Sequence, residues 1–265
     1  MTQDCFYIFR SSELYLNPDN TLPTGLPEAF SGLVVDSLSL ELLGRPSTAI
    51  LLRDEAPRAE VVQRSVSDPG SRLVSSGSWV RLRSITASED PAISRYAAPA
   101  SRALGLLNWH DATRFCPRCG ARLEDHPVEL ARHCPSCAHL FFPRISPAII
   151  VLVRKEGKIL LARHAQRNQD VYSCLAGFLE HGETLEECVA REVREEAGIA
   201  IQNITYVGSQ SWPFPDQHMV AFYADWASGE IAVDRKEIAE AHWFDPEKLP
   251  NTPMPGTVAW RLIHG

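Results

Sequence analysis

Acidic side chains crowd one short stretch of the sequence. The thirteen residues 184–196 carry five glutamates, and three of them, Glu192, Glu195 and Glu196, stand in the order i, i+3 and i+4. On a helix these carboxylates lie side by side, and like charges at that spacing cost roughly a few tenths of a kcal/mol per pair. A hard divalent cation with oxygen ligands would compensate, so the spacing indicates a metal site.

The alternative interpretation of this stretch is a solvated acidic face with local ion pairs. Arg191 follows Glu187 by four residues and precedes Glu195 by four, which allows two helical ion pairs. Those pairs would leave Glu192 and Glu196 facing each other. Helix physics alone leaves both interpretations open.

Four cysteines form a second candidate site. Cys116, Cys119, Cys134 and Cys137 make two C-x2-C pairs separated by fourteen residues. Two such turns complete a tetrahedral sulfur cage, and a fully thiolate-ligated zinc has no open position for water. We therefore expect one structural Zn2+ per subunit. The alternative is a nucleic-acid-binding ribbon, but residues 109–143 carry four arginines against four acidic residues, a balance of zero.

Composition limits the remaining possibilities. The 265 residues are 45% hydrophobic, with a formal net charge of -7, which argues against a surface that holds nucleic acid by phosphate neutralisation alone. The longest apolar run, residues 148–153, is far shorter than the roughly 18 residues of a membrane span. The first residues lack a basic region followed by an apolar one, so we expect a cytoplasmic protein without a disulfide framework. Cys5, Cys174 and Cys188 are expected to be plain apolar residues.

The elements that must position these groups follow from patterning. Residues 1–85 alternate short β-rich runs with turn clusters, and residues 90–109 predict a helix with Asp90 as N-cap and a bend at Pro99. Residues 146–163 predict a hairpin, Thr184 to Gly198 a helix with a buried stripe, residues 220–227 a strand and the C-terminal residues a helix. We expect an N-terminal α+β domain over 1–108, a zinc ribbon over 109–143 and an α/β domain over 144–265.

The acidic helix belongs to a longer pattern. Gly177, Glu183 and the run from Arg191 to Ile199 match G-x5-E-x7-R-E-U-x-E-E-x-G-U at all nine specified positions, where U is aliphatic. The α/β domain therefore resembles the Nudix hydrolases. The resemblance implies an α/β/α sandwich that binds Mg2+ or Mn2+ and hydrolyses a nucleoside diphosphate linked to another group.

The segment SQSWPFPDQ, residues 209–217, narrows the resemblance. By itself it reads as a rigid turn covering the core. It is also similar to the SQPWPFPxS segment of the NADH pyrophosphatase subfamily, with Ser211 and Gln217 as departures, and a four-cysteine ribbon before the Nudix domain is a second mark of that subfamily. The resemblance implies an enzyme that cleaves NAD(H) to nicotinamide mononucleotide and AMP and removes NAD caps from RNA.

The resemblance also implies roles for individual residues. Arg191 would orient the acidic side chains, and Glu195 would act as a further ligand or as a base. The implied ligands of Mg2+ or Mn2+ are the carbonyl of Ala176 and the carboxylates of Glu192, Glu195, Glu196 and Glu237. The implied substrate contacts in the Nudix domain are Phe178, Gln210, Ser211, Trp212, Pro213, Phe214, Pro215, Asp216, Gln217 and the backbone of Ala259.

Three further substrate contacts lie before the Nudix domain. Glu129 matches a substrate-contacting acid, Phe142 stands where the subfamily usually has tyrosine, and Arg83 matches an arginine of the N-terminal domain. In the subfamily the ribbon groups reach the site of the partner subunit, which implies a homodimer.

Two other functions are compatible with the sequence. One is a Nudix hydrolase of ADP-ribose or another nucleotide sugar, which the altered SQSWPFPDQ segment permits. The other is a non-catalytic, nucleotide-sensing RNA-binding protein. The intact set of acidic residues argues against a sensor, and the acidic net charge argues against a general RNA binder.

Overall fold

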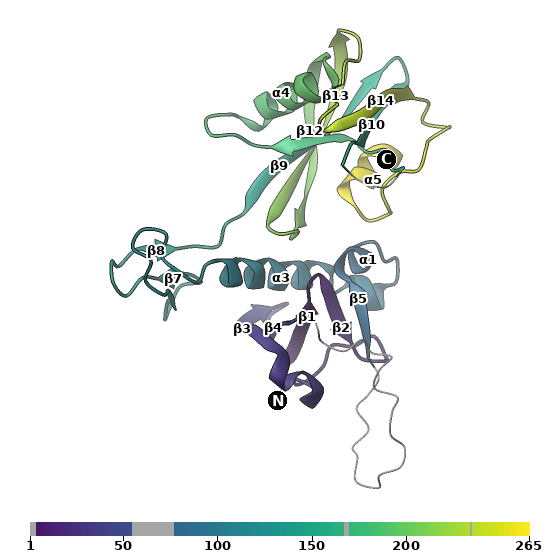
Figure 1. The fold of residues 1–265 in the computed structure, drawn as a ribbon. Coiled ribbons are helices and arrows are strands. Elements are labelled where there is room, and N and C mark those ends of the chain that lie inside the picture. The colour runs from purple at the N-terminus through teal and green to yellow at the C-terminus, as the bar shows by residue number, and fades with distance from the viewer. Residues whose placement is uncertain (1–3, 55–76, 167–169, 234) are drawn as a thin grey trace. The chain divides into compact units, whose positions relative to one another are not determined.

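The computed structural model describes residues 4–54, 77–166, 170–233 and 235–265 (Figure 1). These residues form two compact units. The first contains Met1–Arg144 and Pro213–Asp216, and the second contains Ile145–Trp212 and Gln217–Gly265. The division of the first unit at residue 108 stays a prediction. No helix in the described part of the chain is long and apolar enough to cross a membrane.

The N-terminal part of the first unit is built on a five-stranded sheet in the order β3-β4-β1-β2-β5. Its strands are β1 (Cys5–Arg10), β2 (Glu13–Leu16), β3 (Val34–Leu42), β4 (Arg45–Leu52) and β5 (Ser78–Arg81). Its helices are η1 (Glu28–Leu33), α1 (Leu82–Thr86), α2 (Pro91–Ser94) and α3 (Ala97–Ala112). Phe9, Leu14 and Leu16 pack with Leu104 and Leu107 of α3, so one face of the sheet is covered by this helix.

The predicted helix over 90–109 is present with one change. Asp90 is the N-cap, and its carboxylate accepts a hydrogen bond from the Ala92 backbone N–H. The helix breaks at Arg95 and Tyr96, between α2 and α3, and not at Pro99. Pro99 lies in the first turn of α3, where its missing N–H has no helical partner to lose.

The ribbon follows α3 and consists of three two-residue strands. These are β6 (Glu124–Asp125), β7 (Arg132–His133) and β8 (Leu140–Phe141), paired antiparallel in that order. Such short strands bury little apolar surface. Its small core contains Cys116, Leu123 and Cys134, so the fold of this segment depends on the cysteine cluster described below.

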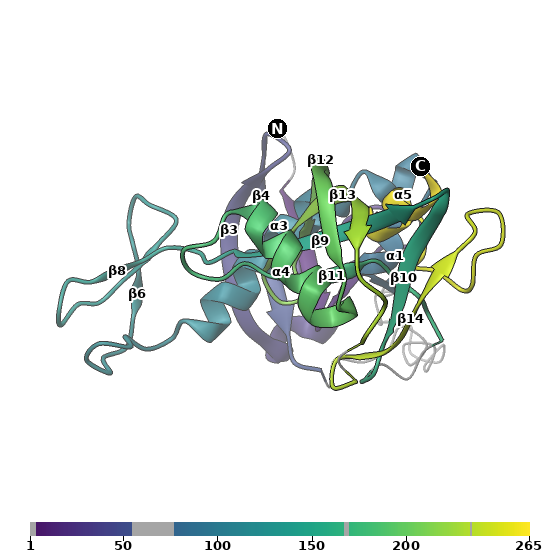
Figure 2. The same cartoon turned by 90° about the horizontal axis from the view of Figure 1, so that it is seen from above.

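The second unit is an α/β/α sandwich. Its six-stranded sheet has the order β12-β13-β9-β10-β14, with β11 paired to β9 (Figure 2). The strands are β9 (Ser146–Lys155), β10 (Lys158–His164), β11 (Leu175–Phe178), β12 (Ala200–Trp212), β13 (Gln217–Ser228) and β14 (Ile238–Phe244). The helices are α4 (Leu185–Ala197) and α5 (Val258–His264). The predicted hairpin, strand and terminal helix are confirmed.

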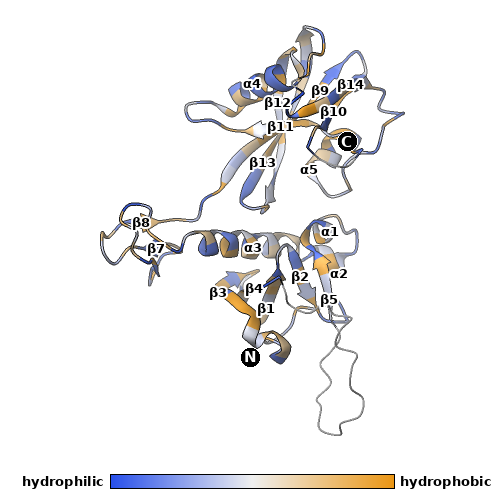
Figure 3. Cartoon of the chain, in the orientation of Figure 1, coloured by the Kyte–Doolittle hydropathy of each residue, from blue (hydrophilic) through white to orange (hydrophobic). Residues whose placement is uncertain are grey.

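The apolar run of β9 explains why the sheet has a helix on each face. Ile149, Val151 and Val153 pack with the buried side chains of α4, whereas Ile150 and Leu152 pack with those of α5. Successive strand residues point to opposite faces, so a strand buried on both sides is apolar throughout. In Figure 3 α4 carries both hydrophilic and hydrophobic segments, as expected for a helix with one buried face.

Candidate active site and zinc centre

Local sequence fixes both ends of α4. Thr184 is the N-cap: its Oγ1 accepts from the Glu187 N–H at 3.2 Å, and Glu187 Oε2 accepts from the Thr184 N–H at 2.8 Å. Gly198 ends the helix in the left-handed conformation, with φ 73°. Both predicted ends are confirmed. Of the two ion pairs that the alternative interpretation allows, the one between Glu187 and Arg191 is not formed, because the Glu187 carboxylate belongs to this capping box.

Arg191 connects the acidic residues of α4 to the loop before it. Its guanidinium donates to Glu183 at 2.6 and 3.0 Å, to Glu192 at 2.9 Å and to Glu195 at 3.0 Å. A further bond, at 2.9 Å, reaches the backbone oxygen of Phe178. The bidentate pair lowers the pKa of Glu183 to about 2. Arg191 therefore holds Glu192 and Glu195 in place, as expected from the sequence.

The carboxylate of Glu192 lies directly on the backbone of β11. A Cβ added to Gly177 would meet Glu192 Cδ at 1.8 Å and its two oxygens at 2.0 and 2.3 Å. Any side chain at position 177 would displace this carboxylate, so glycine is required there for a steric reason. The spacing of Gly177 and Glu192 in the sequence pattern thus corresponds to a direct contact.

Glu196 is a buried carboxylate without full compensation. It is 6% exposed, and its Oε2 has no hydrogen-bond partner among the described residues. Burial, together with the charges of Glu192, Glu237 and Glu195, raises its pKa to about 8, although a backbone hydrogen bond from Ala176 acts in the opposite direction. Burial also raises the pKa of Glu192. An orphaned buried oxygen beside several carboxylates fits a hard divalent cation.

Four of the predicted metal ligands interact pairwise in the second unit. The Glu192 carboxylate of α4 lies on the backbone of Gly177 in β11, the neighbouring Ala176 backbone hydrogen-bonds to Glu196, and the charge of Glu237 acts on both glutamates. The side chain of Glu195 is 59% exposed and turned to Arg191. Phe178 follows Gly177 on β11 with an exposed ring, which leaves a flat apolar surface beside the cluster.

Gln210, a predicted substrate residue of the second unit, hydrogen-bonds to the backbone where α5 begins. The Gln210 side chain donates to the Gly256 backbone oxygen and accepts from the Val258 N–H. Val258 is the first residue of α5 and Ala259 the second, so Gln210 lies against the backbone that precedes the predicted contact at Ala259. Ser211 and Trp212 are the last residues of β12 and Gln217 is the first of β13, on either side of the turn at residues 213–216.

Residues 213–216 of the segment SQSWPFPDQ belong to the first unit, whereas Trp212 belongs to the second. Phe214 packs against the core cluster that contains Leu104 and Leu107, and the Arg83 guanidinium carbon lies 4.7 Å from the centre of its ring. Asn108 of α3 donates to the backbone oxygens of Pro213 and Pro215. Asp216 is half-buried at the end of the turn. Both alternatives for this segment therefore retain support: it is a turn that covers a core, and its flanking residues lie beside α5.

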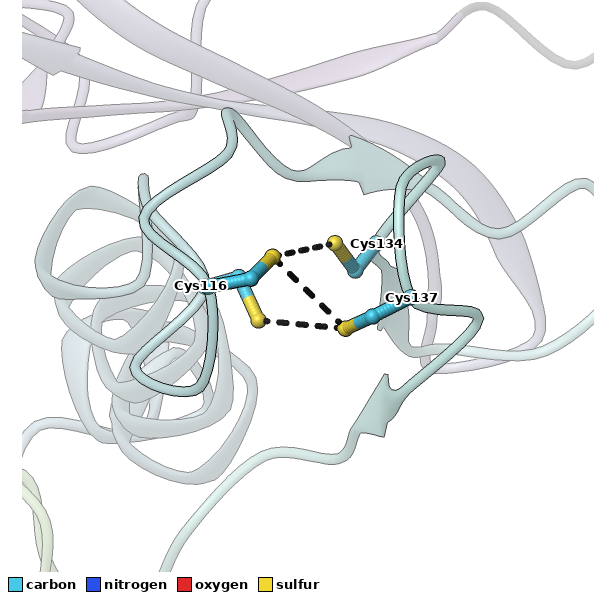
Figure 4. Close-up of side chains that lie close together, drawn as sticks. Cys116, Cys134 and Cys137 are labelled. Carbon is cyan, nitrogen blue, oxygen red and sulfur yellow. Dashed lines mark hydrogen bonds between the residues drawn. The ribbon is translucent and has the colours of Figure 1, made fainter.

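The four ribbon cysteines form a closed sulfur cluster. Their Sγ atoms all lie within 4.8 Å of one another (Figure 4). Three of the Sγ distances are 3.4, 3.7 and 3.7 Å, close to the ~3.8 Å edge of a tetrahedron with zinc–sulfur bonds of about 2.3 Å. The geometry fits a structural Zn2+ with no open coordination position.

Two polar side chains anchor the ribbon to α3. Arg132 is buried, and it donates to the backbone oxygens of His110, Thr113 and Leu123. The His110 ring lies 2.5 Å from an Asp36 oxygen of β3 and 2.7 Å from an Asp125 oxygen of β6. Arg132 is thus a structural residue rather than one of a surface row of arginines.

The remaining ribbon residues singled out by sequence are exposed. Phe142 is 55% exposed, and Glu129 is exposed with its backbone N–H bonded to His126. Both belong to the first unit, as does Arg83, whereas the acidic cluster belongs to the second. Their membership of one substrate site stays a prediction.

Two family models match segments of this chain. The model of the NUDIX domain matches residues 143–261, and the model of the NADH pyrophosphatase zinc ribbon domain matches residues 111–142. A relative described as NAD-capped RNA hydrolase NudC, from Chromobacterium violaceum, is 45% identical over 194 residues, which are 73% of this chain and 72% of the relative. The chain belongs to the NudC branch of the Nudix family.

Other comparisons cover less of the chain. A NudC of the same description from Salmonella paratyphi C is 48% identical over 164 residues, 62% of this chain and 64% of the relative. The match thus spans less than two thirds of that relative. The crystal structure of a NUDIX hydrolase from Nitrosomonas europaea is 24% identical, with a TM-score of 0.48, over 57% of this chain and 86% of that one.

Sequence reasoning missed the roles of three residues in this NudC-type chain. The sequence pattern specifies Glu183 without giving its role, which is the bidentate pair with Arg191 eight residues later. Asn108 and His110 carried no signal, because their partners lie 105, 107 and 74 residues away in the chain.

Proposed function

We propose that this protein hydrolyses the diphosphate of NAD(H) to nicotinamide mononucleotide and AMP, and that it also removes NAD caps from RNA 5' ends. The observation that carries the proposal is the pair Glu192 and Glu196, packed against Gly177 and Ala176 with one buried oxygen unpaired. The zinc ribbon model and the names of the NudC relatives support the choice of substrate.

The proposed metal site uses the residues of α4 and β11. Glu192, Glu196, Glu237 and the Ala176 carbonyl would hold Mg2+ or Mn2+, with Glu195 as a further ligand or as a base. The bound metal would supply neutralisation of the diphosphate oxygens and Lewis acidity toward the attacking water. Arg191 keeps Glu192 and Glu195 oriented through its hydrogen bonds, so that little reorganisation is needed during the reaction.

The proposed substrate site adds residues from several elements. Phe178 would stack on a flat ring of the substrate, and residues 210–217 and the backbone of Ala259 would line the pocket. Arg83, Glu129 and Phe142 would add contacts from the N-terminal domain and the ribbon. Phe142 offers a ring without the hydroxyl that the subfamily usually has, so we expect stacking without that hydrogen bond.

We further propose a homodimer, in which the ribbon completes the partner's site. Large apolar side chains are exposed on the ribbon, which is unfavourable for a monomer and supports an interface there: Phe115, Val128, Leu130, Leu140 and Phe142. A mixture of a Glu196→Gln protein and a Glu129→Gln protein tests this. If each site combines Glu196 of one subunit with Glu129 of the other, subunit exchange produces mixed dimers with one intact site, and activity should return. Two inactive proteins that do not complement each other would contradict the shared site.

Product analysis tests the proposed activity. The purified protein is incubated with Mg2+ or Mn2+ and, separately, with NADH, NAD+, ADP-ribose and NAD-capped RNA, and the products are separated by chromatography. NADH should give reduced nicotinamide mononucleotide and AMP faster than ADP-ribose is cleaved. Preferred cleavage of ADP-ribose would favour the nucleotide-sugar alternative, which the departures of Ser211 and Gln217 from the SQPWPFPxS segment permit. The absence of any cleavage would favour the sensor. A cytoplasmic location stays an expectation from the sequence.

A further inference from the structure

Gln210 and the turn before α5 form one hydrogen-bonded unit. Gln210 Nε2 donates to the Gly256 backbone oxygen at 2.9 Å, and Gln210 Oε1 accepts from the Val258 N–H at 2.8 Å. Both the nitrogen and the oxygen of the side-chain amide are thus hydrogen-bonded to backbone groups, which lie 46 and 48 residues away in the chain. A half-buried glutamine in this arrangement fixes a turn rather than presenting a free amide to solvent.

The turn needs this support because its own geometry is demanding. Gly256 has a φ of 79°, and Thr257 is the buried N-cap of α5. Thr257 Oγ1 donates to the Met254 backbone oxygen and accepts from the Trp260 N–H. Gln210 and Thr257 together therefore satisfy the N–H groups of Val258 and Trp260, which a helix cannot satisfy by itself.

Ala259, which follows Val258, is the residue whose backbone is expected to contact substrate. Ala259 packs in the core cluster with Val258 and Leu262, so its position follows from how α5 begins. A shift of the turn by even an ångström would move the Ala259 backbone with it. Groups that hold a binding backbone in this way affect binding without touching the ligand.

We propose that Gln210 is a positioning residue: it acts on substrate through the Gly256 to Val258 turn and the Ala259 backbone, and not by direct contact of its own amide. This inference rests on the proposed function for the identity of the substrate. It differs from the expectation drawn from the family resemblance, in which the segment 210–217 lines the pocket.

Amide hydrogen exchange and steady-state kinetics together separate the two roles. Gln210→Met keeps the length of the side chain and removes both bonds, and Gln210→Glu keeps the acceptor for Val258 while placing an acceptor against the Gly256 oxygen. Gln202→Ala, on an exposed position of the same strand, is the control. In the absence of substrate, exchange at Val258 should rise by roughly tenfold or more in Gln210→Met, with a smaller rise in Gln210→Glu.

The kinetic readout should follow the same order. KM for NADH should rise by about tenfold in Gln210→Met with kcat changed much less, and Gln210→Glu should lie between it and the wild type. A raised KM with unchanged exchange at residues 254–260 would mean direct contact and would overturn the inference. Unchanged exchange and unchanged KM would overturn it as well. The exchange experiment needs no turnover, so a protein that fails to hydrolyse NADH contradicts the proposed function without deciding the role of Gln210.

Discussion

Gly177→Ala is a small change with a large expected effect on catalysis. The added methyl group would lie 1.8 Å from Glu192 Cδ, whereas ordinary contact begins near 3.4 Å. The carboxylate must therefore move by at least about 1.6 Å, and it then loses its hydrogen bond to Arg191 Nη1. A misplacement of about 1 Å at a reacting centre costs roughly 100-fold in rate, so we expect kcat to fall by about 100-fold or more.

The same substitution should leave the fold nearly intact. The clashing atoms are the end of a flexible side chain, which can swing away, and Gly177 has no positive φ that alanine would strain. We expect the free energy of unfolding to change by no more than about 1 kcal/mol. A fall of kcat by 100-fold corresponds to about 2.7 kcal/mol of lost transition-state stabilisation, so the catalytic effect should exceed the effect on stability.

Gly208→Ala is the matched control. Gly208 lies on β12 of the same unit, and an added Cβ would meet no atom within 4 Å. The assay is the rate of NADH hydrolysis over a titration of Mg2+, with urea denaturation of each variant. If Gly177→Ala hydrolyses NADH within threefold of Gly208→Ala at every Mg2+ concentration, the placement of Glu192 is not what the reaction requires, and the reasoning is refuted.

Three other predictions concern the first unit. Cys134→Ser should reduce bound zinc, measured by elemental analysis, from one per chain to a small fraction and should lower the thermal midpoint, since a structural zinc contributes folding free energy; full zinc content would contradict the four-sulfur site. Asp36 raises the pKa of His110 in the folded state, so its stabilisation is complete below the unfolded pKa of about 6.5 and is lost as the pH rises through the folded pKa. In urea denaturation, His110→Gln should remove this pH-dependent part of the free energy of unfolding, roughly 1 to 3 kcal/mol, whereas the control His181→Gln, at an exposed position, should retain it. The same dependence of the unfolding free energy on pH in both variants would refute the assignment. Phe214→Ala should destabilise the first unit by about 2 kcal/mol in urea denaturation, less than the loss of a fully buried ring, because Phe214 is only partly buried against that core. An unchanged midpoint would show that the turn at residues 213–216 is not part of the core.

The parts of this protein that the sequence predicts are those governed by local rules. The helix from Thr184 to Gly198 is determined by a capping box, a buried stripe and a C-terminal glycine, all within its own length. The hairpin of β9 and β10 likewise follows from a two-residue turn at Glu156 and Gly157. The acidic cluster follows too, since three of its members are neighbours on one helix face.

The parts that the sequence does not predict depend on distant partners. Asn108 meets the WPFP turn more than a hundred residues away, and Gln210 meets Gly256 across 46 residues. Nothing in the neighbourhood of either residue specifies these contacts. The ion pair between Glu187 and Arg191, which the sequence spacing allows, is absent for a different reason: the Glu187 carboxylate accepts hydrogen bonds from the N-cap Thr184 instead.

The most direct test of the central claim is the effect of Glu196→Gln on NADH hydrolysis, compared with Glu186→Gln. The two glutamates lie on the same helix, but Glu186 is exposed in its first turn, while Glu196 is buried with an unpaired oxygen. If Glu196 holds the divalent metal, Glu196→Gln should lower kcat by roughly 100-fold or more with little unfolding, and Glu186→Gln should behave as the wild type. Equal rates in the two variants at saturating Mg2+ would remove Glu196 from the metal site and contradict the account.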